Sequence, residues 1–126
     1  IRDVSNVYEE PAVGTIMGHE WKGKADILGT DRIIDLKTTS SIKDFRYSAR
    51  KYNYDSQCYI YQSLFGKPMV FFAIDKTTGM MGMYEPSEDF ILRGREKVER
   101  ALEVYDKFFG ANAIETIETF YIQETL

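Results

Sequence analysis

Apolar and charged positions alternate between His19 and Leu28, which is typical of a strand buried on one face. One parity carries Trp21, Ala25 and Ile27, and the other carries Glu20, Lys22, Lys24 and Asp26. Gly29-Thr30-Asp31 is a turn signal, and Arg32 to Thr39 is predicted as a second strand that pairs with the first as a hairpin. The preceding residues, from about Ser5, also have strand character, with breaks predicted near Val13-Gly14 and Met17-Gly18.

The middle of the chain predicts one helix and two further strands. Ser40 to Lys51 is polar and basic, which indicates an irregular connection or a short helix. From about Asn53 to Phe65, apolar residues recur at helical spacing, with Asn53 as the expected N-terminal cap and Gly66 as the stop. Met69 to Ile74 predicts a strand buried on both faces, and Met80 to Tyr84 predicts a return strand.

A second helix is predicted after Pro86, with Ser87 as its N-terminal cap and Gly110 at its end. Its expected buried stripe is Ile91, Gly94, Val98, Ala101, Tyr105 and Phe108. Residues 111–126 fit either a helix or a strand, and the pattern does not decide between them. The order of elements predicts a mixed α/β (α+β) fold with one sheet flanked by helices.

Composition limits the domain count and the class of protein. The chain has 126 residues, 44% of them hydrophobic, without repeats or linker-like segments, so we expect a single domain spanning residues 1–126. No apolar run approaches the roughly 20 residues that cross a bilayer, so no membrane partner is expected. Cys58 is the only cysteine, which excludes a disulfide framework or a zinc knuckle within this chain and indicates a reducing, cytoplasmic location.

The net charge of -4 argues against a protein that coats nucleic acid by bulk electrostatics. It does not exclude a nuclease, because carboxylates that hold divalent cations add negative charge that the bound metal reverses. An acidic, metal-dependent enzyme and an ordinary binding module therefore both stay open.

Three charged residues are the candidates for chemistry. Asp35 and Lys37 share one strand face, with Leu36 between them expected to point into the core, and the hairpin would bring Asp26 beside the pair. Two carboxylates and a carbonyl can hold Mg²⁺ against a phosphate, and a lysine can orient the attacking water. On spacing alone, an Asp-x-Lys on a strand is more often a solvated pair.

The motifs Gly23-Lys24-Ala25-Asp26 and Ile33-Ile34-Asp35-Leu36-Lys37-Thr38-Thr39 resemble the core of PD-(D/E)XK nucleases. The match is to the RecB-like branch, and within it to phage-type RecE-like exonucleases (exodeoxyribonuclease VIII). Gln57-Cys58-Tyr59-Ile60-Tyr61 supplies the Q-x-x-x-Y motif of that branch. The resemblance covers roughly Glu10 to Phe108 and implies a restriction-endonuclease-like core, without the N-terminal helix of the family.

The resemblance also implies roles for individual residues. Asp26, Asp35 and the Leu36 carbonyl would ligate Mg²⁺ (or Mn²⁺), and Lys37 would be the catalytic lysine. Gln57 would hydrogen-bond near the active site or to the DNA backbone, supported by Tyr61, for which core packing is the alternative. A further acidic ligand is common in the family, and Glu10 is the candidate for it. The only histidine, His19, is interpreted as structural.

A basic cluster follows the second strand of the hairpin, with aromatic residues interleaved. Its members are Lys43, Arg46, Arg50 and Lys51. They would contact DNA phosphates, together with Tyr61, or form a solvated connection. The later run of Arg93, Arg95, Lys97 and Arg100, alternating with glutamates, is interpreted as a solvated helix face with i,i+4 ion pairs.

The resulting hypothesis is a metal-dependent exonuclease that acts on double-stranded DNA ends in phage or prophage recombination. The resemblance implies degradation of the 5′ strand, a single-strand annealing recombinase as a partner and a homo-oligomer. The first alternative is a catalytically inactive nucleic-acid-binding or scaffolding domain with the same fold, which the presence of Asp26, Asp35 and Lys37 disfavours. A glycosidase with an Asp26–Asp35 acid pair is a weaker alternative, because such enzymes do not need a lysine on the same face.

Overall fold

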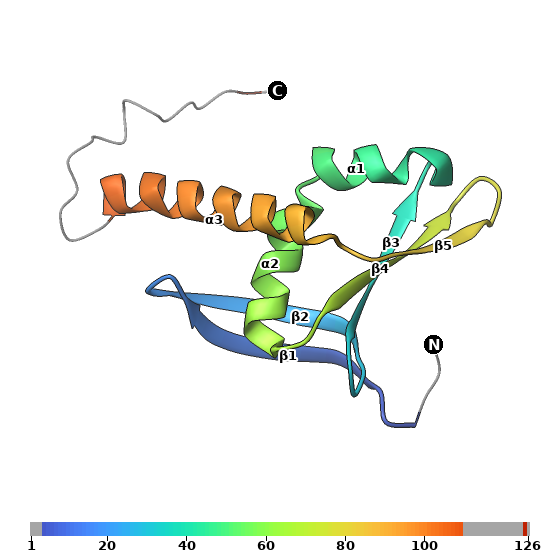
Figure 1. Ribbon diagram of the computed structural model, residues 1–126, viewed down its shortest axis with the longest axis horizontal. Coiled ribbons are helices and arrows are strands. Elements are labelled where there is room, and N and C mark those ends of the chain that lie inside the picture. The colour runs from blue at the N-terminus through green and yellow to red at the C-terminus, as the bar shows by residue number, and fades with distance from the viewer. Residues whose placement is uncertain (1–3, 110–124, 126) are drawn as a thin grey trace.

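Five strands form one mixed sheet in the order β1-β2-β3-β4-β5 (Figure 1). They are β1 (Val7–Ile16), β2 (His19–Leu28), β3 (Ile33–Thr39), β4 (Met69–Asp75) and β5 (Met81–Tyr84). Neighbouring strands are antiparallel except β3 and β4, which are parallel. The computed structural model describes residues 4–109 and 125, so the predicted helix end at Gly110 and nearly all of the undecided segment 111–126 lie outside the described residues. The predicted mixed α/β fold is confirmed.

The first two strands form a long hairpin that turns at Met17-Gly18, where both residues have positive φ angles. The break predicted near Val13-Gly14 is wrong, because β1 continues through it and Gly14 pairs with Trp21. A side chain at Gly14 would press on Leu64, since its Cβ would lie 3.0 Å from Leu64 Cδ2. The glycine therefore marks a close helix–strand approach and not a chain break.

The parallel pair β3–β4 is joined by a helical crossover. It contains the 3₁₀ turn η1 (Ile42–Asp44), α1 (Phe45–Lys51) and α2 (Tyr54–Phe65). The predicted stop at Gly66 is confirmed, because this residue takes the left-handed conformation at φ 66° that glycine tolerates. The predicted capping by Asn53 is wrong. Its backbone is itself left-handed, and its side chain makes no cap hydrogen bond.

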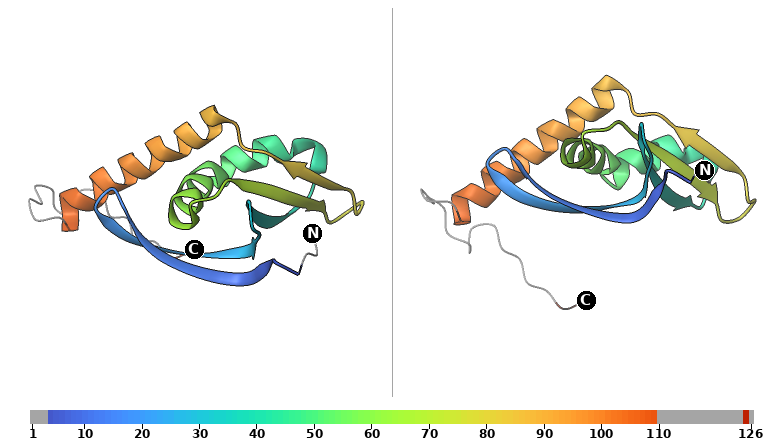
Figure 2. Two further views of the ribbon diagram at one scale, coloured as in Figure 1. Left: turned by 60° about the horizontal axis from the view of Figure 1, so that its bottom comes forward. Right: turned by 90° about the horizontal axis from the view of Figure 1, so that it is seen from below.

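The last described helix, α3 (Glu88–Phe109), begins as predicted. Ser87 Oγ accepts a hydrogen bond from the Phe90 amide at 3.1 Å, which caps the first turn. Gly94 and Val98 are buried, but Ala101 and Tyr105 are exposed, so the predicted stripe is wrong in its second half. The C-terminal half of α3 extends past α2 to the tip of the β1–β2 hairpin, where less protein covers it (Figures 1 and 2).

The described helices all lie on one face of the curved sheet, with α2 between α3 and the β1–β2 hairpin (Figure 2). This face carries the main core, formed by Ala25, Ile33, Phe45, Ala49, Cys58, Met69, Phe71 and Ala73. A smaller cluster on the other face consists of Ile27, Ile34 and Val70 with Phe72 packed against it. None of the described helices is long and apolar enough to cross a membrane.

Candidate active site

The site is built where β2 and β3 separate. The two strands pair through their backbones at Ile27 with Ile34 and at Leu28 with Ile33, and the pairing ends at Ile34. Beyond it, Asp26 Oδ2 accepts a hydrogen bond of 2.8 Å from the Leu36 amide, so a carboxylate takes the place of a strand partner. This bond fixes Asp26 beside the Asp-x-Lys segment, as the hairpin predicted.

The side chain of Leu36 is 45% exposed, so the prediction that it points into the core is wrong. Residues alternate across β3, and Asp35 faces α2, so Leu36 lies on the face that no described helix covers. Its carbonyl belongs to the same backbone segment as the amide bound by Asp26. Leu36 therefore contributes to the site through its backbone alone.

Asp35 is the buried centre of the site, with only 4% of its surface exposed. Gln57 Nε2 on α2 donates a hydrogen bond of 3.2 Å to Oδ1. Lys37 Nζ forms an ion pair with Oδ2 at 2.8 Å, and this buried oxygen has no other hydrogen-bond partner in the described part of the chain. Oδ2 is thus buried with Lys37 as its single partner, which leaves one of its lone pairs for a further group.

Burial raises the pKa of the Asp35 carboxyl above its ordinary value. The Lys37 ammonium opposes this rise, whereas the adjacent Asp26 carboxyl adds to it by charge and by hydrogen bonding. Asp26 binds the amide of Leu36, the residue that follows Asp35, so the two carboxyl groups lie close together. Repulsion between them is the condition that a bound cation would relieve.

An aromatic ring holds Lys37 in place. Its Nζ lies 4.3 Å from the centroid of the Tyr54 ring, which packs in turn against Phe45 and Phe71. The ammonium is therefore held between a carboxylate and a π face and is only 18% exposed. A cavity of about 260 Å³ opens beside Tyr54 at the carboxyl end of β3, next to Thr38.

The donor set suits a hard divalent cation. Asp26 and Asp35 lie close together beside the Leu36 backbone, and Asp35 Oδ2 has Lys37 as its single partner, which suits a ligand set for Mg²⁺ or Mn²⁺ that keeps several waters. Across residues 4–109, no group of three His, Cys, Asp or Glu side chains could hold a metal ion. Glu10 therefore does not join Asp26 and Asp35. It pairs with Ala25 on β2, while the adjacent Glu9 forms an ion pair with Lys24.

Tyr61 lies at the other end of the helix face that carries Gln57. Its hydroxyl accepts a hydrogen bond of 3.3 Å from the Lys24 amide, and its ring packs on Phe65 and close to Gly23. The structure thus places Tyr61 against β2, where it sets the distance between α2 and the strand that carries Asp26. This is the packing alternative given above for Tyr61.

The predicted basic residues are exposed on η1 and α1. Lys43, Arg46, Arg50 and Lys51 form no ion pair with a carboxylate in the part of the chain that the structure describes. His19 lies at the far end of β2, where Nε2 is 3.1 Å from Asp106 Oδ1 on α3. The histidine therefore links the hairpin to α3 and lies away from the carboxylates.

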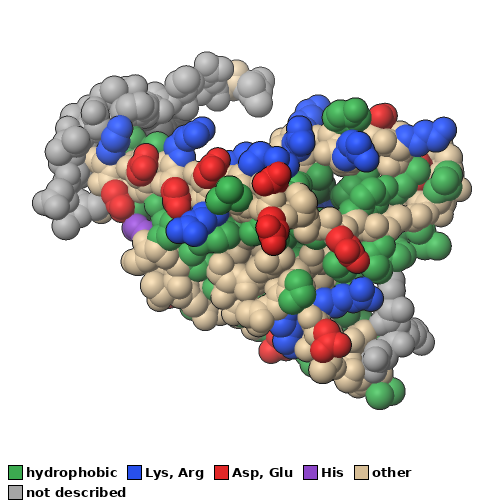
Figure 3. Space-filling model, in the orientation of Figure 1, with side chains coloured by type: hydrophobic (Ala, Val, Ile, Leu, Met, Phe, Trp, Pro, Cys, Tyr) green, Lys and Arg blue, Asp and Glu red, His purple; other side chains and the backbone are tan. Residues whose placement is uncertain are grey.

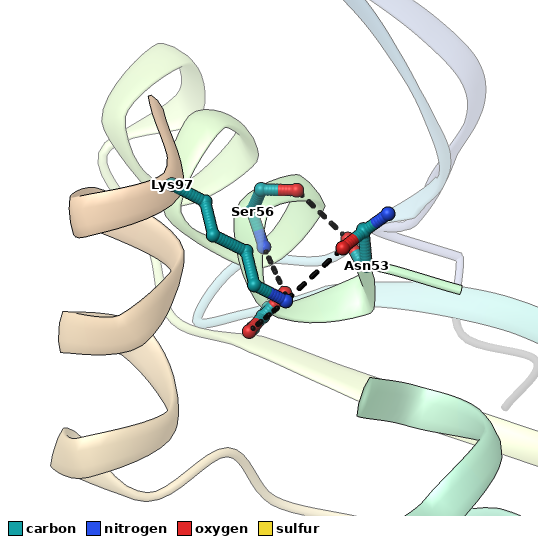
Figure 4. A network of polar contacts seen from close by, with 4 residues as sticks. Asn53, Ser56 and Lys97 are labelled. Carbon is teal, nitrogen blue, oxygen red and sulfur yellow. Dashed lines mark hydrogen bonds and ion pairs between the residues drawn. The ribbon is translucent and has the colours of Figure 1, made fainter. Parts of the chain in front are cut away.

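The sequence pattern did not predict the ion pair between α3 and α2 that positions α2. Lys97 Nζ on α3 lies 2.8 Å from Oδ2 of the buried Asp55 and donates a hydrogen bond of 3.0 Å to Asn53 Oδ1. Figure 4 shows Lys97 reaching from α3 to the first turn of α2, where Ser56 joins the network. The signal was present in the sequence, because Lys97 is one turn from Gly94 and beside Val98 in the predicted buried stripe.

A mixed sheet with Asp26 at a strand divergence, followed by Asp35 and Lys37 on the next strand, defines a PD-(D/E)XK nuclease-type domain. Residues 8–113 match the family described as "PDDEXK-like domain of unknown function (DUF3799)", and the chain belongs to this family. The predicted membership of the PD-(D/E)XK nuclease superfamily is confirmed.

A solved structure shares the fold. The chain is similar to a crystal structure of a "Putative exonuclease" from Eubacterium rectale, with a TM-score of 0.69 and 18% identity, over 95% of this chain and 54% of that one. It also matches the crystal structure of SSO0001, with a TM-score of 0.48 and 20% identity, over 76% of this chain and 50% of that one. The chain thus spans about half the length of these proteins. No curated protein sequence matches it.

Proposed function

We propose that this domain is a metal-dependent deoxyribonuclease that hydrolyses phosphodiester bonds at double-stranded DNA ends. The observation that carries the proposal is the convergence of Asp26, Asp35 and Lys37, in which Lys37 is the single partner of a buried Asp35 oxygen. Paired carboxylates beside an ammonium suit phosphoryl chemistry, in which negative charge develops on oxygen.

Asp26, Asp35 and the Leu36 carbonyl would hold Mg²⁺ or Mn²⁺ at the divergence of β2 and β3. When bound, the ion supplies an activated water and neutralises charge on the phosphate. Gln57 keeps the Asp35 carboxylate oriented through its bond to Oδ1. Lys37, held by Tyr54, presents its ammonium where it can donate a hydrogen bond to the attacking water or to a phosphate oxygen.

The finer assignment follows from the RecE-like motifs. It comprises degradation of the 5′ strand, a role in phage or prophage recombination in the cytoplasm, a single-strand annealing recombinase as a partner and a homo-oligomer. These are proposals about the whole protein's activity and partners, because the chain spans about half the length of the exonuclease structure that shares its fold.

A catalytically inactive DNA-binding domain is the second candidate. It is favoured by one observation, that only two carboxylates converge within residues 4–109, without a third acidic ligand. The Lys37–Asp35 ion pair and the neighbouring Asp26 carboxylate favour the enzyme, because binding to DNA alone needs neither.

The test is digestion of linear and closed-circular duplex DNA by the full chain with Mg²⁺, Mn²⁺ or EDTA, and by Lys37→Ala in parallel. We expect metal-dependent loss of the linear DNA alone, reduced at least 100-fold by Lys37→Ala, on the order of the loss when one transition-state donor is removed. Lys67→Ala is the matched control, because Lys67 donates a hydrogen bond to the Gly29 carbonyl in the β2–β3 turn and forms no ion pair with a described carboxylate. Metal-dependent DNA binding without digestion would establish the inactive domain, and cutting of closed circles would identify an endonuclease.

A further inference from the structure

A second cavity, of about 460 Å³, opens between α1, the segment that follows β5 and the first turns of α3. It is called the α1–α3 pocket below. Its lining combines arginines with aromatic rings, chiefly Arg46, Arg50, Arg93, Tyr84 and Phe90. Figure 3 shows basic side chains gathered over α1 and along α3, on either side of the hollow between these helices.

Three guanidinium groups of the α1–α3 pocket lack carboxylate partners. Arg46 and Arg50 are exposed on α1, and neither they nor Arg93 forms an ion pair with any residue that the structure describes. Arg93 Nε is buried without a hydrogen-bond acceptor, although this arginine was expected on a solvated face. Glu85 is the acidic residue of the lining. In a chain of net charge -4, three uncompensated arginines around one cavity indicate an anionic occupant.

The floor of the pocket is apolar and aromatic. Phe45 and Phe71 form its buried base, and the half-buried rings of Tyr84 and Phe90 line it above them. The Arg93 guanidinium lies 5.9 Å from the centroid of the Phe90 ring. Flat apolar surface beside guanidinium groups suits a nucleobase with its phosphate. The volume suits a small ligand and is too small for a duplex.

The pocket adjoins the candidate active site through shared aromatic residues. Phe45 and Phe71 also pack against Tyr54, whose ring holds Lys37. Helix α1, which carries two of the arginines, follows β3 after the short turn η1. A strand whose phosphate lies at Lys37 could therefore place a neighbouring nucleotide near the pocket.

We propose that the α1–α3 pocket binds one unpaired nucleotide of the DNA strand, with Arg93, Arg46 and Arg50 around its phosphate and its base on Phe90 and Tyr84. This proposal rests on the proposed action on DNA, and it adds a preference for ends that carry single-stranded DNA. Arg93 is the anchor, because its Nε is desolvated and its charge is uncompensated before any ligand binds.

The experiment measures binding of the full chain in EDTA, by fluorescence anisotropy, to a blunt duplex and to the same duplex with a single-stranded extension. We expect the extension to increase affinity, and Arg93→Gln to abolish the increase with about a tenfold loss, as for a hydrogen bond to a charged group. In Arg93→Gln, the slope of the logarithm of the binding constant against the logarithm of salt concentration should fall by about one, as expected for the loss of one phosphate contact. Arg95→Gln is the matched control, since Arg95 pairs with Glu99 on the exposed side of α3.

Photo-crosslinking locates the nucleotide directly. An extension that carries 5-bromodeoxyuridine should attach to the peptide that contains Tyr84 and Phe90 or to α1. If Arg93→Gln lowers the melting temperature, the double variant Arg46→Gln/Arg50→Gln replaces it, because both side chains are exposed. It should also remove the preference for the extension.

Digestion of linear DNA by the wild-type chain separates the two proposals. The nucleotide pocket would be overturned by equal binding of both duplexes, by equal binding of Arg93→Gln and Arg95→Gln, or by crosslinks confined to other segments. In each of these cases, digestion by the wild type would leave the nuclease proposal in place. A wild-type chain that neither binds nor digests DNA would overturn both. Loss of the preference for the extension in the arginine variants, together with crosslinks in the pocket, supports the assignment.

Discussion

The ammonium of Lys97 contacts both carboxylate oxygens of Asp55, at 2.8 Å from Oδ2 and 2.9 Å from Oδ1. Asp55 is 1% exposed, and the only other hydrogen bond that its carboxylate accepts from a described residue comes from the Ser56 amide at 2.8 Å. Lys97 is therefore the counterion of a buried charge in the first turn of α2. The same turn and the next carry Tyr54 and Gln57, so this ion pair positions the residues that hold Lys37 and Asp35.

Lys97→Ala should destabilise the protein by about 3 kcal/mol, because it leaves the Asp55 carboxylate buried without a counterion. Urea denaturation followed by circular dichroism measures the loss. Arg95→Ala is the control on the same helix, and its exposed pair with Glu99 should be worth no more than about 0.5 kcal/mol. Equal stabilities of the two variants would show that Lys97 is not needed as a counterion.

Gly94→Ala should destabilise the protein by about 3 kcal/mol, since the new Cβ would overlap the carbonyl group of Asp55 where α3 crosses α2. The sign is diagnostic, because the same change on an exposed helix face stabilises by about 1 kcal/mol through helix propensity. Thermal melting of Gly94→Ala beside Glu96→Ala, at an exposed position on α3, tests this expectation. A raised melting temperature for Gly94→Ala would mean that the helices do not approach so closely.

The elements of the fold were predictable because each carries a local signal. The alternation of β2, the apolar run of β4 and the Ser87 cap of α3 all depend on nearby residues. The proximity of Asp26, Asp35 and Lys37 was also predictable, since a hairpin places neighbouring strands together.

Features that depend on contacts between distant elements were not predictable. Leu36 reads as a core residue, but it is exposed because the described helices cover only the other face of the sheet. The pattern predicts Lys97 and Arg93 as solvated charges on a helix. The packing of α3 on α2 makes Lys97 the counterion of Asp55, and the pocket between α3 and α1 is lined by Arg93. Asn53 is predicted to cap a helix, whereas its side-chain oxygen accepts a hydrogen bond from Lys97.

Cys58 should be unreactive in the folded protein. The thiol is fully buried, and burial together with the nearby Asp35 and Asp55 raises its pKa to about 12. At pH 8 only about one thiol in ten thousand would be the reactive thiolate. Ellman's reagent should therefore label the native chain at least 100-fold more slowly than the chain in urea, where the single cysteine reacts freely. Rapid labelling of one thiol in the native protein would contradict this burial.

Asp75 should make the free energy of unfolding depend on pH in the acid range. Backbone amides of Ile42, Thr78 and Thr77 donate hydrogen bonds to its carboxylate and hold its pKa below the ordinary value. The unfolded chain then binds a proton at higher pH than the folded chain. The stabilisation by Asp75 is therefore complete well above the ordinary pKa and is lost as pH falls through the lowered folded value.

The variant Asp75→Asn isolates this contribution. It should be less stable than the wild type at pH 7, and the difference should shrink as pH falls from about 5 towards 2.5. Urea denaturation of both proteins at each pH gives the difference, and other carboxylates cancel because both chains contain them. A difference that stays constant over this range would show that Asp75 does not titrate on unfolding.

Mn²⁺ binding offers a test of the candidate metal site that needs no activity. Asp26 and Asp35 lie close together, and the repulsion between two neighbouring carboxylates should favour a divalent cation. Isothermal titration should therefore show one Mn²⁺ site in the wild type, and Asp26→Asn should weaken it at least tenfold. Gln57→Leu should weaken Mn²⁺ binding less, because it removes a hydrogen bond that orients Asp35 and leaves both ligands in place.

Glu10→Gln is the informative control. Glu10 lies outside the pair of carboxylates, so this variant should bind Mn²⁺ as the wild type does. Loss of the site in Glu10→Gln would place a third ligand on β1 and would refute the two-carboxylate arrangement.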